Sequence, residues 1–415
     1  MFDVNHASLN DWLARLEQLH PTEIDLGLTR VGQVAKRLNC LKPAPLVIVV
    51  GGTNGKGTTS AFISALLMAQ GLKVGQYNSP HIHRYNERVR INEQEASDAD
   101  ICRSFQAVEA QRQNTSLTYF EFGTLAALEY FKQQQVDACV LEIGLGGRLD
   151  AVNIVDSDIA VVTSVGLDHQ AFLGNTLEQI AYEKCSIARA SKYLVCGQIN
   201  PPATAFETVQ KLGGKWCARD QDFFIEQNSQ GLLVRFTLGQ IQQWQLPKAH
   251  IPHHNVATAL QTLALINRLP SQQLTSQVLS NLRVPGRLQR FQRGDLTLIL
   301  DVAHNEQAAA YIGEALPKVD GLILGMLADK EPDKVFPVLP KAKRLILVGL
   351  DGHRGQSAAQ LLARAEFSPK PELKDNVAAA MATLPNHGCW LICGSFHTVD
   401  AALEVINQEG TWSHN

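Results

Sequence analysis

From about residue 45 the chain alternates short apolar runs with stretches of helical periodicity. The runs are strand-length, and a helix is expected over 58–70 between the first two. Strands alternating with helices are typical of a parallel β-sheet covered by helices on both faces. The expected strands are PLVIVV (45–50), LKVGQY (72–77), VDACVLEIG (136–144), DIAVVTSVG (158–166) and KYLVCG (192–197).

The rhythm changes after residue 200. A glutamine-rich alternating stretch, 223–246, is typical of an antiparallel patch. Strand and helix patterns then resume in LTLILDVAHN (296–305), GLILGMLAD, KRLILVGLDG and CWLICGSFHTV. We therefore predict an α/β protein of two domains, with residues 1–285 forming a larger parallel-sheet domain and residues 286–415 a smaller Rossmann-like one. A length of 415 residues agrees, because single cores stop growing near roughly 250 to 300 residues.

Composition excludes several classes of protein. Apolar residues make up 45% of the chain and charged residues 19%, which suits buried cores, and the net charge of -3 offers no excess of cations for a nucleic-acid backbone. The first 21 residues read as an amphipathic helix capped by Ser8 and Asp11, not as a signal peptide, and no apolar run could cross a bilayer. Eight scattered cysteines lack metal-ligand spacing. We expect a soluble, cytoplasmic protein with reduced thiols, no nucleic-acid partner and no membrane partner.

A glycine-rich turn with a lysine follows the first strand. GGTNGKGTT lies between that strand and an apolar-periodic helix, where backbone amides and the helix dipole favour a phosphate. Gly51 and Gly55 stand one residue closer together than in G-x-x-x-x-G-K-[ST], and Gly57 occupies the Ser/Thr position. An ordinary strand-to-helix turn is the alternative. We predict phosphate binding by Gly55, Lys56, Gly57 and Thr58.

Two other positions suggest chemistry. Glu142 ends an apolar strand, where a carboxylate is either paired structurally or part of a site. Lys184 lies in an apolar helical stripe with Leu177, Ile180 and Ile187, so it either extends its ammonium to water or is buried with a lowered pKa.

A series of longer motifs then follows in order: TNGKGT, SPHIHRYNERVRI (79–91), TYFEFGTLAAL (118–128), LEIGLGGRLDAVN (141–153), VGLDHQAFLGNTLEQIAYEKCSI (165–187), HNVATAL (254–260), PGRLQ (285–289), LDVAHN (300–305) and CGSFHTV (393–399). Together they resemble the folylpolyglutamate synthase family and its bacterial bifunctional form, within the Mur ligase superfamily. The resemblance runs over nearly the whole chain, and it implies a P-loop domain like the Mur ligase central domain, followed by a glutamate-ligase domain.

The resemblance also implies a nucleotide and metal site. It places Mg²⁺ on Ser79 and Glu142 and a second Mg²⁺ on His169, with Lys184 carboxylated by CO₂ to support that second ion; it leaves room for a monovalent cation. Without the resemblance, a histidine in a turn, such as His169, would be interpreted as a structural residue. The implied ATP contacts are Thr53, Asn54, Gly55, Lys56, Gly57, Thr58, Asn255, Arg287 and Asp301.

The substrate side is likewise implied by resemblance. Aromatic rings suit a flat pterin and cations suit a carboxylate, although core aromatics and a helix-capping Asp150 are the ordinary alternatives. Arg84, Arg88 and Arg90 either form a solvated strand face or order the SPH loop. Ser395 and His397 resemble the glutamate-side loop. The implied pteroate contacts are Ile24, Asp25, Leu26, Thr118, Tyr119, Phe120, Glu121, Leu149, Asp150 and Ala151.

The expected activity is an ATP-dependent amide ligation through an acyl phosphate, with Lys56 and Lys184 as the catalytic lysines. The expected substrates are L-glutamate, dihydropteroate and reduced folates, and we expect a monomer. A folylpolyglutamate synthase alone, a Mur-type amino-acid ligase, a small-molecule kinase and a nucleotide switch remain alternatives. The first 45 residues leave no room for the nucleotide-sugar domain of a Mur-type ligase.

Overall fold

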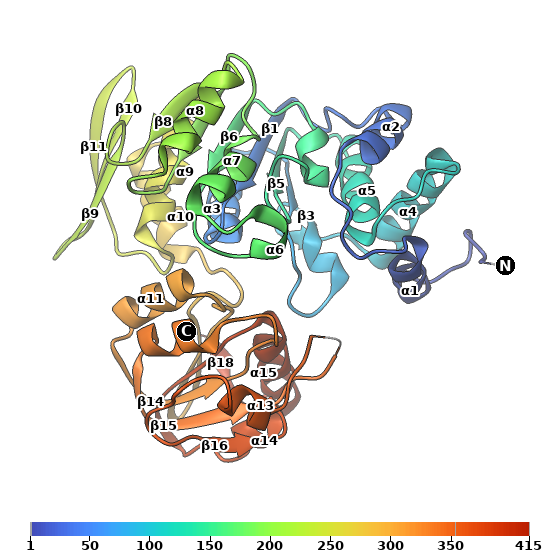
Figure 1. Cartoon of the computed structure of the whole chain (residues 1–415). Helices are drawn as coiled ribbons and strands as arrows, with labels where there is room; N and C mark the ends of the chain where they lie inside the picture. The colour runs from blue at the N-terminus through green and yellow to red at the C-terminus, as the bar shows by residue number, and fades with distance from the viewer. Residues whose placement is uncertain (1, 353, 415) are drawn as a thin grey trace. The chain divides into compact units, whose positions relative to one another are not determined.

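The computed structural model describes residues 2–352 and 354–414. By their contacts the residues divide into two compact units, Met1–Leu282 and Arg283–Asn415. This division falls three residues before the predicted boundary. Both units are α/β, as the alternating pattern predicted (Figure 1).

The first unit is built on an eight-stranded sheet of order β4-β3-β2-β5-β1-β6-β7-β8. Strands β2, β5, β1, β6, β7 and β8 are parallel, and β3 and β4 add an antiparallel edge. The bounds of the strands are β1 Leu46–Gly51, β2 Val74–Tyr77, β3 Val89–Ile91, β4 Gln94–Glu95, β5 Ala138–Glu142, β6 Ile159–Val162, β7 Tyr193–Cys196 and β8 Lys215–Ala218. All five strands predicted before residue 200 are therefore confirmed.

Helices cover both faces of this sheet. Alternate residues of β1 point to opposite faces, so Val47 and Val49 join the core beneath α1, α2, α4, α5 and α7. Helices α3, α9 and α10 pack together on the other face (Figure 1). The helix bounds are α1 Leu9–Leu19, α2 Thr29–Leu38, α3 Lys56–Met68, α4 Asp98–Arg112, α5 Tyr119–Gln133, α6 Gln170–Leu173, α7 Leu177–Cys185, α8 Ala203–Lys211, α9 His253–Leu265 and α10 Gln272–Asn281, with 3₁₀ turns η1 Tyr85–Arg88 and η2 Ala151–Ile154.

Two local predictions are confirmed in this unit. Helix α1 begins with the expected capping box of Ser8 and Asp11. The glutamine-rich stretch forms an antiparallel sheet of order β11-β10-β9, and its middle strand packs on α9. The bounds are β9 Phe224–Asn228, β10 Gly231–Leu238 and β11 Gln240–Leu246.

The second unit has a seven-stranded sheet of order β16-β15-β14-β17-β13-β12-β18, parallel from β16 to β13 and antiparallel beyond. Its strands are β12 Gln289–Arg293, β13 Asp295–Asp301, β14 Lys318–Leu324, β15 Lys341–Val348, β16 Glu372–Lys374, β17 His387–Cys393 and β18 Ser413–His414. Its helices are α11 Glu306–Ala315, α12 Pro332–Val335, α13 Ala358–Leu362, α14 Val377–Met381 and α15 Phe396–Glu409, with a 3₁₀ turn η3 Phe336–Val338. The four strands predicted here are confirmed as β13, β14, β15 and β17.

All eight cysteines are free thiols, and six of them are buried. Among the described residues, no helix is both long enough and apolar enough to span a bilayer.

Candidate active site

The glycine-rich loop joins β1 to α3 at the carboxyl edge of the parallel strands, the edge at which open α/β sheets bind ligands. Gly55 is the N-cap of α3 and has a φ of 85°, a conformation that favours glycine. A Cβ on Gly55 would lie 2.7 Å from Oδ1 of Asn255. Both the backbone conformation and the close neighbour therefore require glycine at this position.

The loop is fixed to the segment after β6. Thr53 Oγ1 donates to the carbonyl of Gly166 at 3.1 Å and accepts from the Gly166 amide at 2.9 Å. The carbonyl of Asn54 accepts from the hydroxyls of Thr163 at 2.6 Å and Ser164 at 3.1 Å. Sequence reasoning did not single out Thr163 or Ser164, although their position at the end of an apolar strand gave the signal.

Lys56 opens α3 with its ammonium folded over the loop. Its Nζ donates to the carbonyls of Gly52 at 3.0 Å and Thr53 at 3.2 Å. Thr58 follows in the same turn and is buried. The charge therefore lies where a phosphate on the loop amides would meet it.

Asn255 lies in the first turn of α9 and is fully buried, yet both polar atoms of its amide lack a hydrogen-bond partner. An unpaired buried amide costs about 1–3 kcal/mol. Because it faces Gly55 across the loop, a bound nucleotide is a fitting source of the missing partner. This observation suits the expected role of Asn255 in ATP binding.

Glu142 ends β5 as a buried carboxylate. Its Oε2 accepts from Asn78 Nδ2 at 2.8 Å and lies 3.4 Å from the amide nitrogen of Ser79. A Cβ on Gly57 would lie 3.5 Å from the same oxygen, so this carboxylate adjoins the start of α3. Carboxylate and hydroxyl oxygens are ligands that Mg²⁺ prefers, and Ser79 with Glu142 supplies both. Their chemistry therefore fits the expected metal.

His169 comes from a different segment. It is the N-cap of α6, with a φ of 51°, and its side chain is 40% exposed. Its Nε2 lies 4.0 Å from Oδ1 of Asp168, an acidic neighbour that was not predicted. The assignment of His169 to a second metal stays a prediction.

Lys184 is buried on α7. Burial, and after it the positive charge of Lys56, lower the pKa of Lys184 to about 7, while Asp168 opposes the shift. The interpretation that Lys184 extends to water is therefore wrong. The predicted stripe is also partly wrong, because Leu177 is 41% exposed, although Ile180 and Ile187 are buried.

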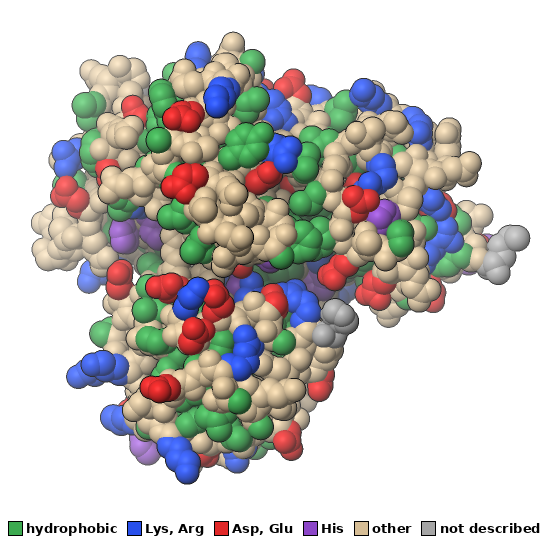
Figure 2. All heavy atoms as spheres, viewed as in Figure 1, with side chains coloured by type: hydrophobic (Ala, Val, Ile, Leu, Met, Phe, Trp, Pro, Cys, Tyr) green, Lys and Arg blue, Asp and Glu red, His purple; other side chains and the backbone are tan. Residues whose placement is uncertain are grey.

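Helix α7 is tied to the loop after β5. The Arg148 amide donates to the Glu183 carbonyl at 2.8 Å, and its guanidinium pairs with the Glu183 carboxylate at 2.9 Å. Figure 2 shows hydrophobic side chains at the surface over α6 and α7, where Phe172 and Tyr182 are each more than two-fifths exposed. The two contacts between Arg148 and Glu183 thus hold the backbone beside Lys184, although part of the helix faces solvent.

The segments at 118–121 and 144–151 meet in the first unit. A Cβ on Gly144 would collide with the Phe120 ring. Asp150 is buried, and its carboxylate accepts from the amides of Leu145 at 2.7 Å and Val152 at 2.9 Å. Burial raises the pKa of Asp150 to about 7 against these hydrogen bonds. The capping role offered as the ordinary alternative is confirmed for Asp150, at η2.

Most of the other expected pteroate contacts lie on the same segments, whereas Ile24, Asp25 and Leu26 precede α2. Thr118 and Ala151 are buried, whereas Tyr119 and Leu149 are half-buried. Ile24 is 37% exposed, and the carboxylate of Asp25 pairs with Arg30 at 2.6 Å. Their contact with substrate stays a prediction.

The three arginines of residues 84–90 differ. Arg84 pairs with Asp98 at 3.3 Å and Arg90 with Glu95 at 3.1 Å, both on the surface. Arg88 donates through Nε to Nδ1 of His81 at 2.8 Å, so it alone of the three bonds to the SPH loop in the contacts described. Its guanidinium also lies over the Tyr119 ring at 5.5 Å.

The second unit carries the remaining expected ATP contacts. Asp301, at the end of β13, is buried and accepts from the amides of Leu288 and Ala303, each at 2.9 Å. Burial raises the pKa of Asp301, and Arg287 opposes that shift. The Arg287 guanidinium lies over the Phe396 ring at 5.6 Å. Arg287 and Asp301 thus share one neighbourhood within this unit.

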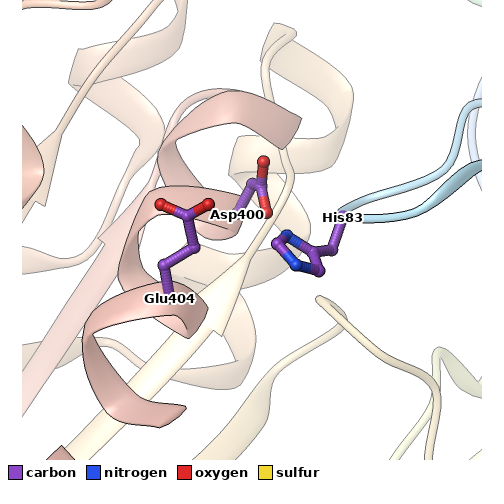
Figure 3. A group of neighbouring side chains, drawn as sticks. All are labelled: His83, Asp400 and Glu404. Atoms are coloured by element: carbon purple, nitrogen blue, oxygen red, sulfur yellow. The ribbon is translucent and has the colours of Figure 1, made fainter. Parts of the chain in front are cut away.

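Helix α15 carries the expected glutamate-side residues. Ser395 is its N-cap and accepts from the Thr398 amide at 3.0 Å, which is a structural role, and His397 is exposed. Figure 3 shows the carboxyl groups of Asp400 and Glu404 on consecutive turns of this helix. His83, also labelled there, belongs to the first unit. Acidic pairs are common on surface helices, and we assign this one no ligand.

A hollow of about 490 Å³ lies at the amino ends of the parallel strands of the first sheet, at the end opposite the glycine-rich loop. It is lined mostly by residues that precede or begin the strands, among them Asp137, Asp158 and Lys192. Because the glycine-rich loop, Glu142 and Lys184 gather at the carboxyl edge, this hollow is distinct from the candidate active site.

The two units match families of known domains. Residues 50–265 match the Mur ligase middle domain, and residues 286–396 match the Mur ligase glutamate ligase domain. These matches place the chain in the Mur ligase superfamily.

Full-length relatives narrow this class. The dihydrofolate synthase/folylpolyglutamate synthase of Escherichia coli (strain K12) is 42% identical over 412 residues, covering 96% of each chain. The structure of E. coli FolC in complex with DHPP and ADP has a TM-score of 0.92 and 40% identity and covers 99% of this chain and 100% of its own. The Yersinia pestis bifunctional enzyme with AMPPNP and Mn has a TM-score of 0.91 and 40% identity, with 98% and 100% coverage. The chain belongs to the dihydrofolate synthase/folylpolyglutamate synthase family of Mur ligases, which are ATP-dependent ligases.

Proposed function

We propose that the protein joins L-glutamate to dihydropteroate, forming dihydrofolate, and to the γ-carboxylate of reduced folates. The observation that carries this proposal is the full-length match to bifunctional relatives, together with a glycine-rich loop, a buried glutamate and a buried lysine at one edge of the sheet. The γ-phosphate of ATP transfers to the substrate carboxylate, giving an acyl phosphate and ADP. The amine of glutamate then attacks the acyl carbon, and phosphate leaves.

The glycine-rich loop would bind the nucleotide. The amides of 55–58 at the start of α3 suit its phosphates, because those of Thr53 and Asn54 already donate to Ser164. Lys56 would neutralise charge on the transferred phosphoryl group. Asn255 would pair with the nucleotide, and Arg287 and Asp301 are proposed ATP contacts of the second unit. Relatives solved with ADP and with AMPPNP support a bound nucleotide.

Ser79 and Glu142 would hold one Mg²⁺, and His169 would serve a second. Bound metal would supply positive charge beside the β- and γ-phosphates. A relative solved with Mn supports a divalent ion. Lys184 fits carboxylation: its neutral amine, present in quantity near pH 7, would bond to the carbon of CO₂ and release one proton. A monovalent cation, a monomeric state, the lack of a nucleic-acid partner and a cytoplasmic location stay predictions.

The pteroate is proposed to lie on the segments at 24–26, 118–121 and 149–151, with Tyr119 and Phe120 as apolar surface. Arg88 suits a carboxylate because its charge lies beside the SPH loop. Ser395 and His397 are proposed for the glutamate side.

The test is glutamate-dependent release of ADP by the purified protein with Mg²⁺ and ATP. The assay is run separately with dihydropteroate and with tetrahydrofolate. Turnover with both substrates is expected. Turnover with tetrahydrofolate alone would leave only the folylpolyglutamate synthase activity, and turnover with neither would reject the proposal.

A further inference from the structure

Arg30, the second residue of α2, contacts two segments of the proposed pteroate site. Its Nη1 pairs with Oδ2 of Asp25 at 2.6 Å, and its Nη2 donates to the Asp25 carbonyl at 3.0 Å. Nη2 also donates to Oε1 of Glu121 at 3.1 Å. One guanidinium therefore joins the segment at 24–26 to the first turn of α5.

The Glu121 end of this contact is buried. The side chain of Glu121 is 5% exposed, and its Oε2 accepts from the Thr118 amide at 2.8 Å. The Glu121 amide donates in turn to Thr118 Oγ1 at 3.2 Å, which completes a capping box. Because a buried carboxylate needs a partner charge, Arg30 stabilises the turn that carries Tyr119 and Phe120.

The Asp25 end is less regular. Residues 24–26 belong to no helix or strand. The Asp25 side chain is 39% exposed and also lies 3.4 Å from Nε2 of His20. Arg30 holds this segment through the carboxylate and the backbone carbonyl of Asp25, so the position of the segment depends on the Arg30 side chain.

We propose that Arg30 is a positioning residue for the folate acid: it sets the distance between the 24–26 segment and the Tyr119–Phe120 turn. The inference rests on the proposed function. It reassigns the carboxylates of Asp25 and Glu121, which pair with Arg30, and leaves substrate contact to their neighbours. Dihydropteroate and tetrahydrofolate share a pterin end, so Arg30 should affect both substrates alike.

The test compares R30Q, R30K and R37Q. Arg37 lies on the same helix and is exposed. It donates to the carbonyls of Gln111 and Arg112 and not to the segments at 24–26 or 118–121. R30Q should raise KM for both folate acids by about tenfold and leave KM for ATP and glutamate unchanged. R30K should be intermediate, because an ammonium keeps the charge but cannot span three acceptors. R37Q should match the wild type.

Equal KM values of R30Q and R37Q for the folate acids would overturn the inference. A rise in the KM of R30Q for ATP as large as its rise for the folate acids would also overturn it. If R30Q does not fold, D25N removes the charge that pairs with Arg30 Nη1 and keeps the bond to the Asp25 carbonyl. D25N should still raise both folate KM values, and unchanged values would overturn the inference. A wild-type protein without turnover would reject the proposed function instead. Direct binding of dihydropteroate, followed by protein fluorescence, would then decide: R30Q should bind more weakly than R37Q, and equal binding would overturn the inference.

Discussion

The glycine-rich loop at 52–55 and the segment at 24–26 both lack regular structure, yet they are held in different ways. Backbone amides, carbonyls and short hydroxyl side chains of 163–166 fix the loop. The side chain of Arg30 fixes the segment at 24–26, with His20 also beside Asp25. The first arrangement needs only small residues at the ends of adjacent parallel strands, whereas the second depends on large side chains from outside the segment.

This difference separates the general part of the reaction from the selective part. All ATP-dependent ligases bind the same phosphate groups of ATP. The phosphate site can therefore be built from backbone groups and the ends of strands. The folate acid needs a surface of specific shape. Helices α1, α2, α4 and α5 cover that side of the sheet, and the expected pteroate residues come from α5 and its surroundings.

The strongest test of the nucleotide side is Lys56→Ala. Removing the ammonium should lower kcat by about 10³-fold with dihydropteroate and with tetrahydrofolate, since both reactions transfer the same phosphoryl group. Glutamate-dependent ADP release measures it. A loss confined to one folate acid would contradict a shared nucleotide site.

Lys184→Met should lower turnover by about 10²-fold with both substrates, because an apolar side chain cannot be carboxylated. Added CO₂ should raise the activity of wild-type protein that was depleted of it, and should leave the variant unchanged. Full turnover by Lys184→Met would reject the carbamate.

The same variant should be more stable than the wild type when CO₂ is removed. The pKa of Lys184 is lowered from 10.5 to about 7, so between these values the unfolded chain binds a proton that the folded chain does not. The stability of the wild type therefore rises with pH across this window. The gain from methionine should reach about 5 kcal/mol at or below pH 7 and shrink toward pH 10.5, since each tenfold change in proton affinity corresponds to about 1.4 kcal/mol. Denaturant unfolding of both proteins at several pH values measures this gain.

These two lysines also show how far the sequence could reach. The phosphate-binding role of Lys56 was predicted from one continuous stretch of sequence, because the strand, the glycine-rich turn and the helix follow one another directly. Lys184 was singled out by periodicity, but its burial depends on α7 packing against the loop that carries Arg148. The contact of Arg30 with Glu121 spans 91 positions, and no local pattern indicates it. Strands and adjacent motifs were therefore predictable, whereas side-chain pairs between distant segments were not.

Asn255→Ala is expected to act on the nucleotide alone. Its buried amide would pair with ATP, so truncation should raise KM for ATP by about tenfold, which corresponds to about 1.4 kcal/mol. KM for either folate acid should not change. Because the unpaired amide is removed, the free enzyme should lose no stability, and a large fall in the unfolding midpoint would contradict the assigned role.

Phe120→Leu should give the smallest effect and should act on the folate side alone. Phe120 packs on Gly144 and faces Tyr77 with ring centroids 6.2 Å apart, so leucine keeps the apolar contact but loses the flat surface. A stacked aromatic pair contributes about 0.5–1.5 kcal/mol, which predicts a rise of about threefold to tenfold in KM for dihydropteroate and for tetrahydrofolate. The matched control is Phe131→Leu on the same helix, whose fully buried ring contacts the Gly75 side of the sheet. That control should lose stability without a change in folate KM, because its ring lies in the core; if both variants change KM equally, Phe120 acts through folding and not through substrate.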